Sequence, residues 1–495
     1  MPFPIKAKSH GQQWEVVAPL SGPTLLEFLQ NQEVPIRSSC RGKGLCHQCR
    51  VKVTKGLAPV AAADRKFFSE KLLQQGWRLG CQLRPKAAME LEFPQVYQLQ
   101  EDLHIKRCPV SPWWLALDAG TTGLELSAID KKGPWCNLKA VNRQITMGAD
   151  IMTRLESVQH QGIKPLRQKL FSQLKHMLAT IEKQAQGQHF TGRLVAAGNS
   201  VMASFLANLS VDQLGVSPHR PASYKGQRVD HEGFQLETLP LLYNFVGGDL
   251  WAGLFYLWQK GKRNNPGWIL LDVGTNSEIL FWDGNHLLVS STPAGPAFEG
   301  SNISIGMRAE AGAILDPTYA PEGGWQFKVI NGDIPRGLCG SSLIQMVAEA
   351  VKSGLIKTDG EIVEEQSLCL QDDLVLSQAD VREFQLAKSA IRTGLEMVMK
   401  AVDQKAECLL VAGAFGKHLP VEASYSLGLL PEIPVTTLGN TSLLGTMAWG
   451  EAHPELREEF TDWVNCVKKP LDLALRDDFQ KMFVSYMNLE PGANQ

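Results

Sequence analysis

Apolar and polar positions alternate in short runs through the first 95 residues, which is the pattern of half-buried strands. The run IKAKSHGQQWEVVAP predicts a hairpin that turns at His10–Gly11. Residues 21–31 open with Ser21 as a helix cap and then carry apolar side chains at helical spacing. Later runs predict a strand at 49–56, a short helix at 64–76, and strands at 77–85 and 88–94. These residues are therefore predicted to form a small α+β unit.

Two longer strand–turn–strand patterns follow, and they are near copies of each other. WWLALDAGTTGLELSAID spans 113–130 and WILLDVGTNSEILFWDG spans 268–284, and their apolar first strands end at Asp118 and Asp272. Another apolar strand ends in the glycine pair Gly413 and Gly416. Apolar stripes at 164–186 and 380–402 predict helices that pack on sheets. The duplication predicts two related α/β lobes.

The turn after each aspartate carries the small polar residues that a phosphate loop needs. They are Gly120, Thr121 and Thr122 in the first turn, and Gly274, Thr275 and Asn276 in the second. Backbone N–H groups and hydroxyls can donate to phosphate there, while the carboxylate holds Mg²⁺ through water. An ordinary hairpin explains one such motif, but two at matching positions favour a nucleotide site. Gly413 and Gly416 would leave bare backbone for adenine and ribose, although strand ends favour glycine anyway.

Composition narrows the class of protein. The 495 residues suggest about three domains, and the charges are scattered, with 20% charged residues and a net charge of −2. A nucleic-acid partner would call for a basic stripe, so none is expected. No apolar run approaches the ~18 residues of a membrane helix, and the N-terminus lacks an export signal. We expect a cytoplasmic protein without a membrane partner.

Four cysteines near the N-terminus, Cys40, Cys46, Cys49 and Cys81, have the spacing of a 2Fe–2S site. Three come from one loop, and a distant segment supplies the fourth. Gly42 and Gly44 let this loop take positive φ and bring N–H groups close to the sulfurs. Zinc usually takes its thiols as two C-x2-C pairs, and only one such pair is present.

His47 and the remaining six cysteines are not expected to bind the cluster. His47 inside the loop is expected to be a solvated residue, because Rieske ligation needs two histidines. Six further cysteines lack pair spacing and are expected to be reduced packing thiols: Cys108, Cys136, Cys339, Cys369, Cys408 and Cys466.

Residues 1–95 resemble the β-grasp ferredoxin fold, with a cysteine spacing closer to vertebrate-type than to plant-type ferredoxins. Residues 96–112 are expected to be a linker, 113–265 a first ATPase lobe, and 266–495 a second lobe with C-terminal helices. The duplicated turns and the glycine pair resemble the superfamily of acetate and sugar kinases, heat-shock chaperones and actin. The fold class implied is α/β with an N-terminal α+β ferredoxin domain and a duplicated two-lobed actin-like ATPase core.

Further segments narrow the resemblance to the ATP-dependent reductive activators of corrinoid proteins. These segments lie at 141–155, 197–202, 246–249, 292–314, 337–342 and 438–446. The resemblance implies an ATP-hydrolysing enzyme that passes one electron through its 2Fe–2S cluster to an inactive Co(II) corrinoid, which returns to Co(I). It implies ATP and Mg²⁺ as further cofactors. The implied partners are a corrinoid-binding protein or corrinoid-dependent methyltransferase and a low-potential electron donor, with a homodimer as an open expectation.

Within this frame Asp118 and Asp272 are expected to position Mg²⁺ and the attacking water. Either Glu278 or Glu299 could orient the water, and Glu299 could equally be a helix-capping acid. Asp249 is a further candidate carboxylate, with a plain turn role as its alternative. Gly295, Gly340 and Ser341 complete the expected nucleotide-binding set.

The chain also departs from the family, and other functions compete. Family members often have an extra domain between the ferredoxin and ATPase parts, which only about seventeen residues join here. Gly123 stands where threonine is frequent in the family, and Ser277 and Ser342 stand where glycine is frequent. Each of these changes replaces one small residue by another. A sugar or acetate kinase would not need the cluster. A ferredoxin reductase would need a dinucleotide fingerprint, which we do not find. An iron-sulfur redox sensor that gates an actin-like nucleotide-binding domain remains the alternative.

Overall fold

The computed structural model describes residues 2–491 with gaps at 10–11, 20–21, 33, 35, 37, 39, 41, 45–46, 94–100, 149, 301, 333, 364–366, 372–373, 417 and 474–475. Contacts divide the chain into two compact units. One comprises Met1–His104, Thr121–Leu124 and Leu138–Leu178, and the other comprises Ile105–Gly120, Glu125–Asn137 and Ala179–Gln495.

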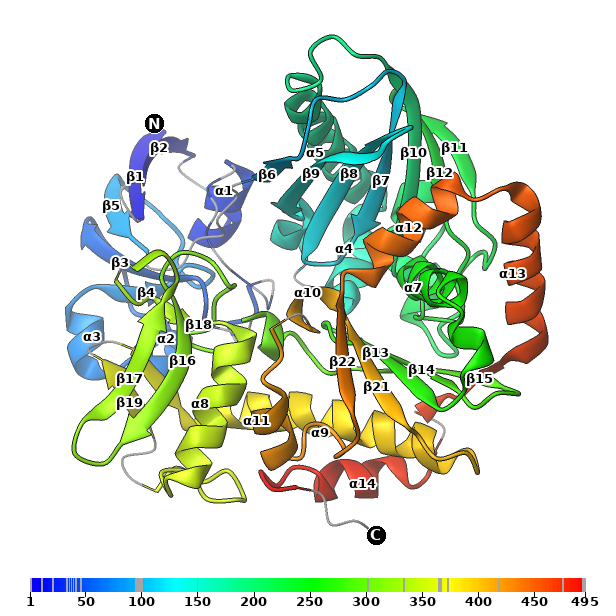
Figure 1. Ribbon diagram of the computed structural model, residues 1–495. Helices are drawn as coiled ribbons and strands as arrows, with labels where there is room; N and C mark the ends of the chain where they lie inside the picture. The colour runs from blue at the N-terminus through cyan, green and yellow to red at the C-terminus, as the bar shows by residue number, and fades with distance from the viewer. Residues whose placement is uncertain are drawn as a thin grey trace. The chain divides into compact units, whose positions relative to one another are not determined.

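The N-terminal residues form a five-stranded sheet in the order β2-β1-β5-β3-β4 (Figure 1). Its strands are β1 (Phe3–Ser9), β2 (Gln12–Ala18), β3 (Arg50–Lys55), β4 (Trp77–Leu79) and β5 (Met89–Glu92). The antiparallel register of β1 with β2 confirms the predicted hairpin, although its turn at His10–Gly11 lies outside the described residues. β1 pairs in parallel with β5, which closes the sheet as predicted.

Helix boundaries in this part differ from the prediction. Helix α1 (Leu25–Asn31) is capped by Thr24, which forms a capping box with Glu27, so the helix begins later than Ser21 implied. One predicted helix is two, α2 (Ala62–Phe67) and α3 (Glu70–Gln74). The break follows from extended backbone at Phe68 and from Ser69, whose side chain accepts a hydrogen bond from the Leu72 N–H and starts α3.

A seven-stranded sheet has the order β11-β12-β10-β7-β8-β9-β6. Its strands are β6 (Asp102–Ile105), β7 (Trp113–Ala119), β8 (Gly123–Asp130), β9 (Gly133–Val141), β10 (Phe190–Gly198), β11 (Arg228–His231) and β12 (Phe234–Thr238). Most side chains of β7 are buried, as expected of a central strand. The predicted linker is not featureless, because its residues 102–105 form the edge strand β6.

The helices of this part of the chain are η1 (Arg143–Met147), α4 (Ile151–Gln161), α5 (Lys164–Glu182), α6 (Ser200–Ala207), η2 (Asp212–Gly215), α7 (Gly248–Gln259) and η3 (Lys262–Asn264). Helix α5 confirms the predicted helix, and its leucines Leu166, Leu170 and Leu174 are fully buried. The Gln173 side chain donates to the Val141 carbonyl at 2.6 Å, which fixes α5 to the end of β9.

A six-stranded sheet has the order β22-β21-β13-β14-β15-β23. Its strands are β13 (Trp268–Asp272), β14 (Ser277–Trp282), β15 (Leu287–Thr292), β21 (Cys408–Ala412), β22 (Val435–Gly439) and β23 (Lys468–Pro470). In the seven-stranded sheet, β7 pairs in parallel with β10 and is followed by β8 and β9. In the six-stranded sheet, β13 pairs in parallel with β21 and is followed by β14 and β15. This shared order, β10-β7-β8-β9 and β21-β13-β14-β15, confirms the predicted duplication.

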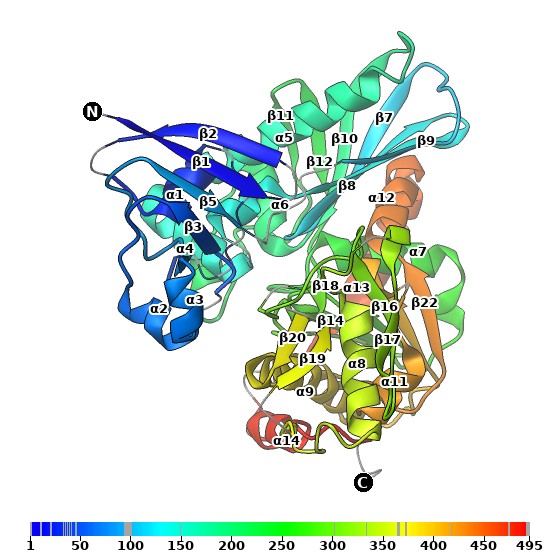
Figure 2. The ribbon, with the colours of Figure 1, turned by 90° about the vertical axis from the view of Figure 1, so that its left-hand side faces the viewer.

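The remaining elements all follow β15 in the chain. They are η4 (Ala297–Glu299), β16 (Ala313–Ala320), β17 (Gly324–Val329), η5 (Ile330–Gly332), β18 (Gly337–Leu338), α8 (Gly340–Lys352), β19 (Ser367–Gln371), β20 (Leu374–Ser377), α9 (Gln378–Lys400), α10 (Gly413–Gly416), α11 (Val421–Ser426), α12 (Thr441–Glu451), α13 (Pro454–Val467) and α14 (Phe479–Ser485). Figure 2 shows α8 beside the β16–β17 hairpin, in agreement with their contacts.

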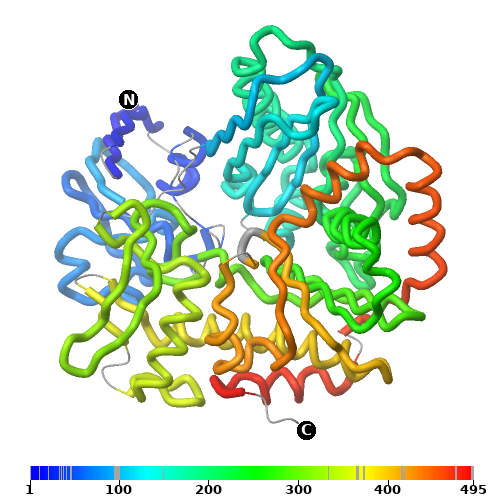
Figure 3. The backbone as a smooth tube through the Cα atoms, viewed as in Figure 1, coloured from blue at the N-terminus to red at the C-terminus, as the bar shows by residue number. Residues whose placement is uncertain are grey.

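Two helix pairs determine how the six-stranded sheet is supported. Helix α9 packs on β14 and β15, and α14 runs along α9, as the yellow and red tubes of Figure 3 show. The buried Lys388 of α9 donates to the Tyr486 carbonyl at 2.7 Å, which caps the end of α14. Helices α7 and α12 cross so closely that a Cβ on Gly445 would lie 1.8 Å from the Ala252 carbonyl oxygen.

The cysteines outside the N-terminal loop correct one prediction. Cys136 and Cys339 are buried packing thiols, but Cys108, Cys369 and Cys466 are exposed, so that prediction is wrong for these three. They lie on the outer faces of their segments, which spacing along the chain does not reveal. Among the described residues, no helix combines the length and apolar character that crossing a bilayer requires.

Candidate functional sites

The described cysteines of the predicted cluster gather around one loop. Cys49 directly precedes β3 and is buried, Cys81 is a buried residue in the turn two positions after β4, and Cys40 is partly exposed. Cys46 lies outside the described residues. The backbone binds the two segments together, because the Gly80 N–H donates to the Cys49 carbonyl at 2.8 Å.

The loop environment favours thiolate at Cys81. A hydrogen bond with the Cys49 side chain is the largest cause that lowers the pKa of Cys81, ahead of burial, which opposes it. The Gln82 amide and the Gly44 backbone N–H lower that pKa further. Gly42 and Gly44 have φ of 83° and 75°, so the predicted positive φ is confirmed. The contact between the Cys49 and Cys81 side chains, with N–H donors aimed at Cys81, fits a 2Fe–2S cluster, whose ligands are thiolates.

The prediction that His47 is a solvated loop residue is wrong. Its ring stacks on Phe67, with the ring centroids 3.8 Å apart and an interplanar angle of 14°. Burial against this ring lowers the pKa of His47, because the charged imidazole is disfavoured there. The aromatic partner comes from α2, which lies outside the loop in sequence.

The two motif aspartates occupy equivalent places in the two large sheets. Asp118 on β7 is opposite Ala197 of the parallel strand β10, and Asp272 on β13 is opposite Ala412 of the parallel strand β21. A glycine follows each alanine. A Cβ at Gly198 would lie 2.7 Å from the Ala119 carbonyl oxygen, and a Cβ at Gly413 would lie 2.6 Å from Asp272 Oδ1. Gly413 thus makes room for the carboxylate itself, and its φ of +87° also favours glycine.

Five of the predicted acidic residues form one electrostatic group. The pKa of Asp249 is raised to about 7, mainly by burial and in part by the charge of Asp118. Burial also raises the pKa of Asp272 to about 7, with contributions from Asp249, Asp118 and Glu299. The pKa of Glu278 lies well above its usual range, first through burial and then through Asp249 and Asp272. These shifts require that the carboxylates share a small region.

Such a group of carboxylates fits a divalent cation. Uncompensated negative charge is unfavourable in a partly buried site, and a cation among the carboxylates would relieve it. Within the described part of the chain, no three His, Cys, Asp or Glu side chains are arranged to hold a metal ion directly. Mg²⁺ keeps several of its waters and takes one or two protein carboxylates, so a looser arrangement suits it.

Asp118 has partners that the sequence did not suggest. Asn440 Nδ2 donates to Asp118 Oδ2 at 2.8 Å, and Ser442 Oγ donates to Asp118 Oδ1 at 2.7 Å. Both donors lie at the start of α12, where Asn440 is also the N-cap. The same Nδ2 donates to Glu125 Oε2 on β8 at 2.9 Å. The only sequence signal was their position in the segment 438–446.

The second phosphate-type turn is closed by hydrogen bonds from the segment after β15. Thr275 Oγ1 donates to Glu299 Oε1 at 2.8 Å, and the Gly295 N–H donates to the Thr275 carbonyl at 2.8 Å. Glu278 is opposite Asp272 in the β13–β14 register and is only 7% exposed. Of the two candidate glutamates, Glu299 contacts the turn, whereas Glu278 is buried on a strand.

The first turn is held differently, by a buried arginine. The Arg154 guanidinium, on α4, donates to the Thr121 carbonyl, to the Gly148 carbonyl at 2.9 Å and to Gln144 Oε1 at 3.2 Å. Arg154 is 0% exposed. The Thr122 carbonyl accepts from the Asn142 N–H at 3.0 Å. Sequence reasoning placed Arg154 inside a family segment but gave it no role.

The other predicted residues lie at element ends. Asp249 is in the first turn of α7, and its Oδ1 accepts from the Leu250 N–H at 2.9 Å. Gly340 and Ser341 begin α8, which packs against η4. A Cβ at Gly416 would lie 3.0 Å from Val411 Cγ1, so this glycine serves close packing of α10 on β21. Gly120, Gly274 and Asn276 lie in the turns after Asp118 and Asp272.

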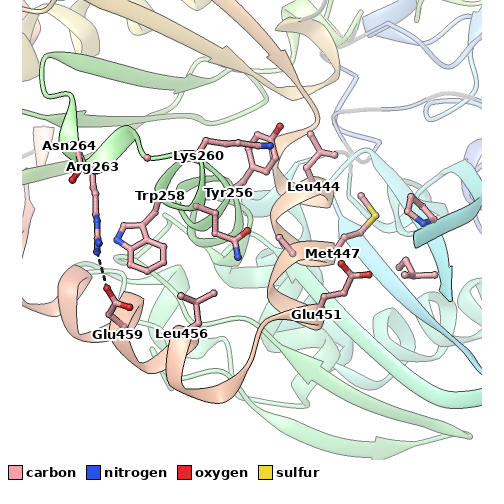
Figure 4. A pocket seen from close by; sticks show the side chains of 15 residues that line it. Tyr256, Trp258, Lys260, Arg263, Asn264, Leu444, Met447, Glu451, Leu456 and Glu459 are labelled. Carbon is pink, nitrogen blue, oxygen red and sulfur yellow. Dashed lines mark hydrogen bonds and ion pairs between the residues drawn. The ribbon is translucent and has the colours of Figure 1, made fainter. Parts of the chain in front are cut away.

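A pocket of about 910 Å³ lies away from the carboxylates, at the far ends of α7 and α12 (Figure 4). Tyr256 on α7 and Lys260 directly after α7 line it, together with Met447 and Glu451 on α12. Two further lining residues, Arg263 and Glu459, form an ion pair at 3.0 Å. Asp249 is one full helix length from Lys260, on the order of 16 Å at the helical rise. The pocket is therefore separate from the motif residues.

Comparison with known families matches the chain in three consecutive parts. The 2Fe-2S iron-sulfur cluster binding domain matches residues 7–86, and the RACo middle region matches residues 114–258. The C-terminal domain of RACo, the ASKHA domain, matches residues 267–494.

Individual relatives match about two thirds of the chain. The corrinoid activation enzyme RamQ of Eubacterium limosum is 29% identical over 384 residues, 68% of this chain and 63% of the relative. The Co(II) methylated amine-specific corrinoid protein reductase of Methanosarcina barkeri is 25% identical over 389 residues, 66% of this chain and 68% of the relative. The match thus spans just under two thirds of the first relative's length.

A solved structure, described as a reductive activator for corrinoid, iron-sulfur protein, has a TM-score of 0.68 with 22% identity and covers 98% of both chains. It confirms the predicted fold class.

Proposed function

We propose that this chain is a reductive activator of corrinoid proteins, which reduces the Co(II) of a corrinoid protein to Co(I) in an ATP-dependent reaction. The three consecutive family matches and the two relatives support this proposal. The acceptor is a corrinoid-binding protein or a corrinoid-dependent methyltransferase, and the electron passes through the 2Fe–2S cluster. The observation that carries the proposal is the presence, on one chain, of a converging cysteine loop and a group of carboxylates at duplicated strand ends.

The need for ATP follows from reduction potentials. A ferredoxin-type 2Fe–2S cluster has a potential near about −400 mV. We expect Co(II) in a corrinoid to accept an electron only at a similar or lower potential, and each ~59 mV of deficit is a tenfold disadvantage for a one-electron step. ATP binding or hydrolysis would supply a conformational change that makes the transfer irreversible or alters the ligation of cobalt.

The proposed division of roles uses the site as described above. Cys40, Cys46, Cys49 and Cys81 hold the cluster. Asp118, hydrogen-bonded on both oxygens, orients Mg²⁺, whose charge would stabilise the phosphates when it is bound. Asp272, with a pKa of about 7, can take a proton from water near neutral pH, and Glu299 orients that water through its contact with Thr275.

The nucleotide contacts are proposed for the two turns and the flanking glycines. The proposed phosphate contacts are Gly120, Thr121, Thr122, Gly274, Thr275, Asn276 and Gly295. The proposed nucleoside contacts are Gly340, Ser341, Gly413 and Gly416. Asp249 contributes a further carboxylate. Burial raises the pKa of Glu278, which favours its neutral form beside Asp272. The domain limits proposed are 1–95, 96–112, 113–265 and 266–495. A low-potential donor, a cytoplasmic location and a homodimer are part of the same proposal.

The test is cobalt reduction in a defined system. The assay combines the intact chain with a low-potential reductant, Mg-ATP and a Co(II) corrinoid protein from the same organism. Co(II) should be converted to Co(I), which is measured as the loss of the Co(II) absorption band. Omission of ATP should stop net conversion. Equal Co(I) formation without ATP would reduce the protein to a simple electron carrier.

Two variants separate the cluster from the nucleotide site. The parent should contain about two irons and two sulfides, and Cys49→Ser should lose most of them. This variant should still hydrolyse ATP but should not reduce the corrinoid protein. Cys136→Ser, which changes a buried thiol elsewhere, should keep its iron. Asp272→Asn should keep a reducible cluster and fail to form Co(I). If no corrinoid protein of the organism is reduced while cluster oxidation changes nucleotide affinity, the redox-sensor function holds instead.

A further inference from the structure

Asn440 occupies a bridging position between two strands of the seven-stranded sheet. One amide nitrogen donates to both Asp118 on β7 and Glu125 on β8, at 2.8 and 2.9 Å. Its oxygen accepts from the Leu443 N–H at 2.9 Å and so caps α12. A single side chain thereby ties the start of a helix to a carboxylate that is 322 positions away in sequence.

The remaining hydrogen bonds fix the direction of these carboxylates. Ser442, 5% exposed, supplies a donor to the second oxygen of Asp118 at 2.7 Å. Glu125 accepts on its other oxygen from Asn137 Nδ2 on β9 at 3.0 Å. Both oxygens of Asp118 and both of Glu125 are therefore engaged, and three strands and one helix contribute to the network.

The helix that carries Asn440 is itself held rigidly. Gly445 of α12 lies against the Ala252 backbone of α7, and a Cβ at Gly253 would lie 2.9 Å from Thr441 Oγ1. Helix α7 begins with Asp249 in its first turn. The starts of both crossing helices therefore carry groups of the carboxylate site, which makes their mutual position part of the site geometry.

We propose that Asn440 and Ser442 are positioning residues that aim Asp118 at the Mg²⁺ of Mg-nucleotide, an inference that rests on the proposed function of the site. Donors to both oxygens orient the carboxylate, in the way that outer-shell partners orient metal ligands elsewhere. Neither residue touches nucleotide in this proposal, since their donor groups are used on Asp118.

The test measures binding rather than turnover. Calorimetric titration with a non-hydrolysable ATP analogue is carried out with and without Mg²⁺, on the intact chain. Asn440→Ser keeps an N-cap oxygen but lacks the bridging amide, and should lose about 10- to 100-fold in affinity with Mg²⁺. Its affinity without Mg²⁺ should stay within about twofold of the parent. Ser442→Ala should show a smaller loss in the same direction, and the exposed turn variant Asn285→Ser should bind as the parent does.

A double-mutant cycle distinguishes positioning from general structural support. If Asn440 acts through Asp118, then Asn440→Ser should add no further loss in an Asp118→Asn background. Additive losses, equal losses with and without Mg²⁺, or a parent whose affinity ignores Mg²⁺ would each overturn the inference. Should Asn440→Ser fail to fold, as judged by its thermal transition, Ser442→Ala and its cycle with Asp118→Asn decide alone. Failure of cobalt reduction would leave these binding results standing, so the two claims fail separately.

Discussion

Asp118 and Asp272 lie at the ends of equivalent strands, each opposite an alanine that a glycine follows in the parallel neighbour, yet their surroundings differ. Asp118 accepts hydrogen bonds on both oxygens, from Asn440 and Ser442. Within the described residues no donor reaches the Asp272 carboxylate, and burial with neighbouring carboxylates raises its pKa to about 7. Hydrogen bonds to a carboxylate favour its charged form, whereas burial favours the neutral form.

The difference teaches how a duplicated motif can divide its labour. When the environments of two like groups push their proton affinities apart, one suits metal binding and the other suits proton transfer. The turns that follow the aspartates also differ. The buried Arg154 guanidinium holds the first turn, whereas a Thr275–Glu299 hydrogen bond closes the second. Equivalent backbone positions thus carry different chemistry because unrelated segments cover them.

The largest expected effect comes from Asp272→Asn. If Asp272 is the general base that we propose, its removal should lower turnover by about 10²- to 10⁴-fold. Affinity for Mg-nucleotide should change far less, whereas Asp118→Asn should weaken the Mg²⁺ dependence of binding. Steady-state ATP hydrolysis with the corrinoid partner, together with calorimetry, measures both quantities. Identical profiles for the two variants would remove the proposed division of labour.

The backbone of this comparison was predictable from the sequence. Apolar strands that end in Asp-x-Gly-Thr predicted both turns and the duplication, because burial and turn residues are local signals. The Thr24–Glu27 capping box was also readable, although Ser21 was preferred. β6 was missed because four residues at a sheet edge carry little apolar periodicity.

The environments of the two aspartates were not predictable from local signals. Asn440 meets Asp118 only because α12 begins beside β7 in the folded chain. Arg154 lies on helix α4, where a sequence pattern alone predicts that an arginine is exposed to solvent, yet it is fully buried. The pKa shifts arise from burial and from charges that long-range contacts bring together.

The second prediction contrasts the supports of the two turns. Arg154→Met keeps much of the side-chain volume but leaves the Thr121 and Gly148 carbonyls without their buried donor, which costs about 2–3 kcal/mol. Thr275→Val removes one hydrogen bond to Glu299 and should cost about 1 kcal/mol. Thermal midpoints should fall by roughly 5–10 °C for the first and by a few degrees for the second. The exposed Arg65→Met is the control, and a larger loss from Thr275→Val would reverse the contrast.

The third prediction uses two glycines with similar φ. Gly413 and Gly187 have φ of 87° and 78°, so an alanine at either costs about 1 kcal/mol in backbone strain. Only at Gly413 would the new Cβ meet a side chain, Asp272 Oδ1 at 2.6 Å, whereas nothing lies within 4 Å at Gly187. Gly413→Ala should therefore lower ATP turnover by tenfold or more, since displaced catalytic groups are this costly, while Gly187→Ala should not. Equal turnover in the two variants would show that the Asp272 carboxylate tolerates displacement.

The smallest expected effect is a shift in pH dependence, and its sign follows from the charges. Asp272 must lose its proton to act as a base, so turnover should rise with pH through a limb near 7. The negative charge of Asp249 raises the pKa of Asp272, and Asp249→Asn should therefore move that limb to lower pH by roughly half a unit to one unit.

The same raised pKa has a consequence for stability. Because the folded-state value of Asp272 exceeds the usual 3.8, its favourable contribution is complete below about pH 4 and is lost as pH rises through about 7. Asp272→Asn should then be more stable than the parent at pH 8, on the order of 1 kcal/mol for a group that keeps some contact with solvent, and equally stable near pH 4. Thermal unfolding of the nucleotide-free proteins at both pH values, without Mg²⁺, measures this difference. A parent that is more stable than Asp272→Asn at pH 8 would mean that Asp272, like Asp118, is already stabilised in its charged form, and the contrast between the two aspartates would disappear.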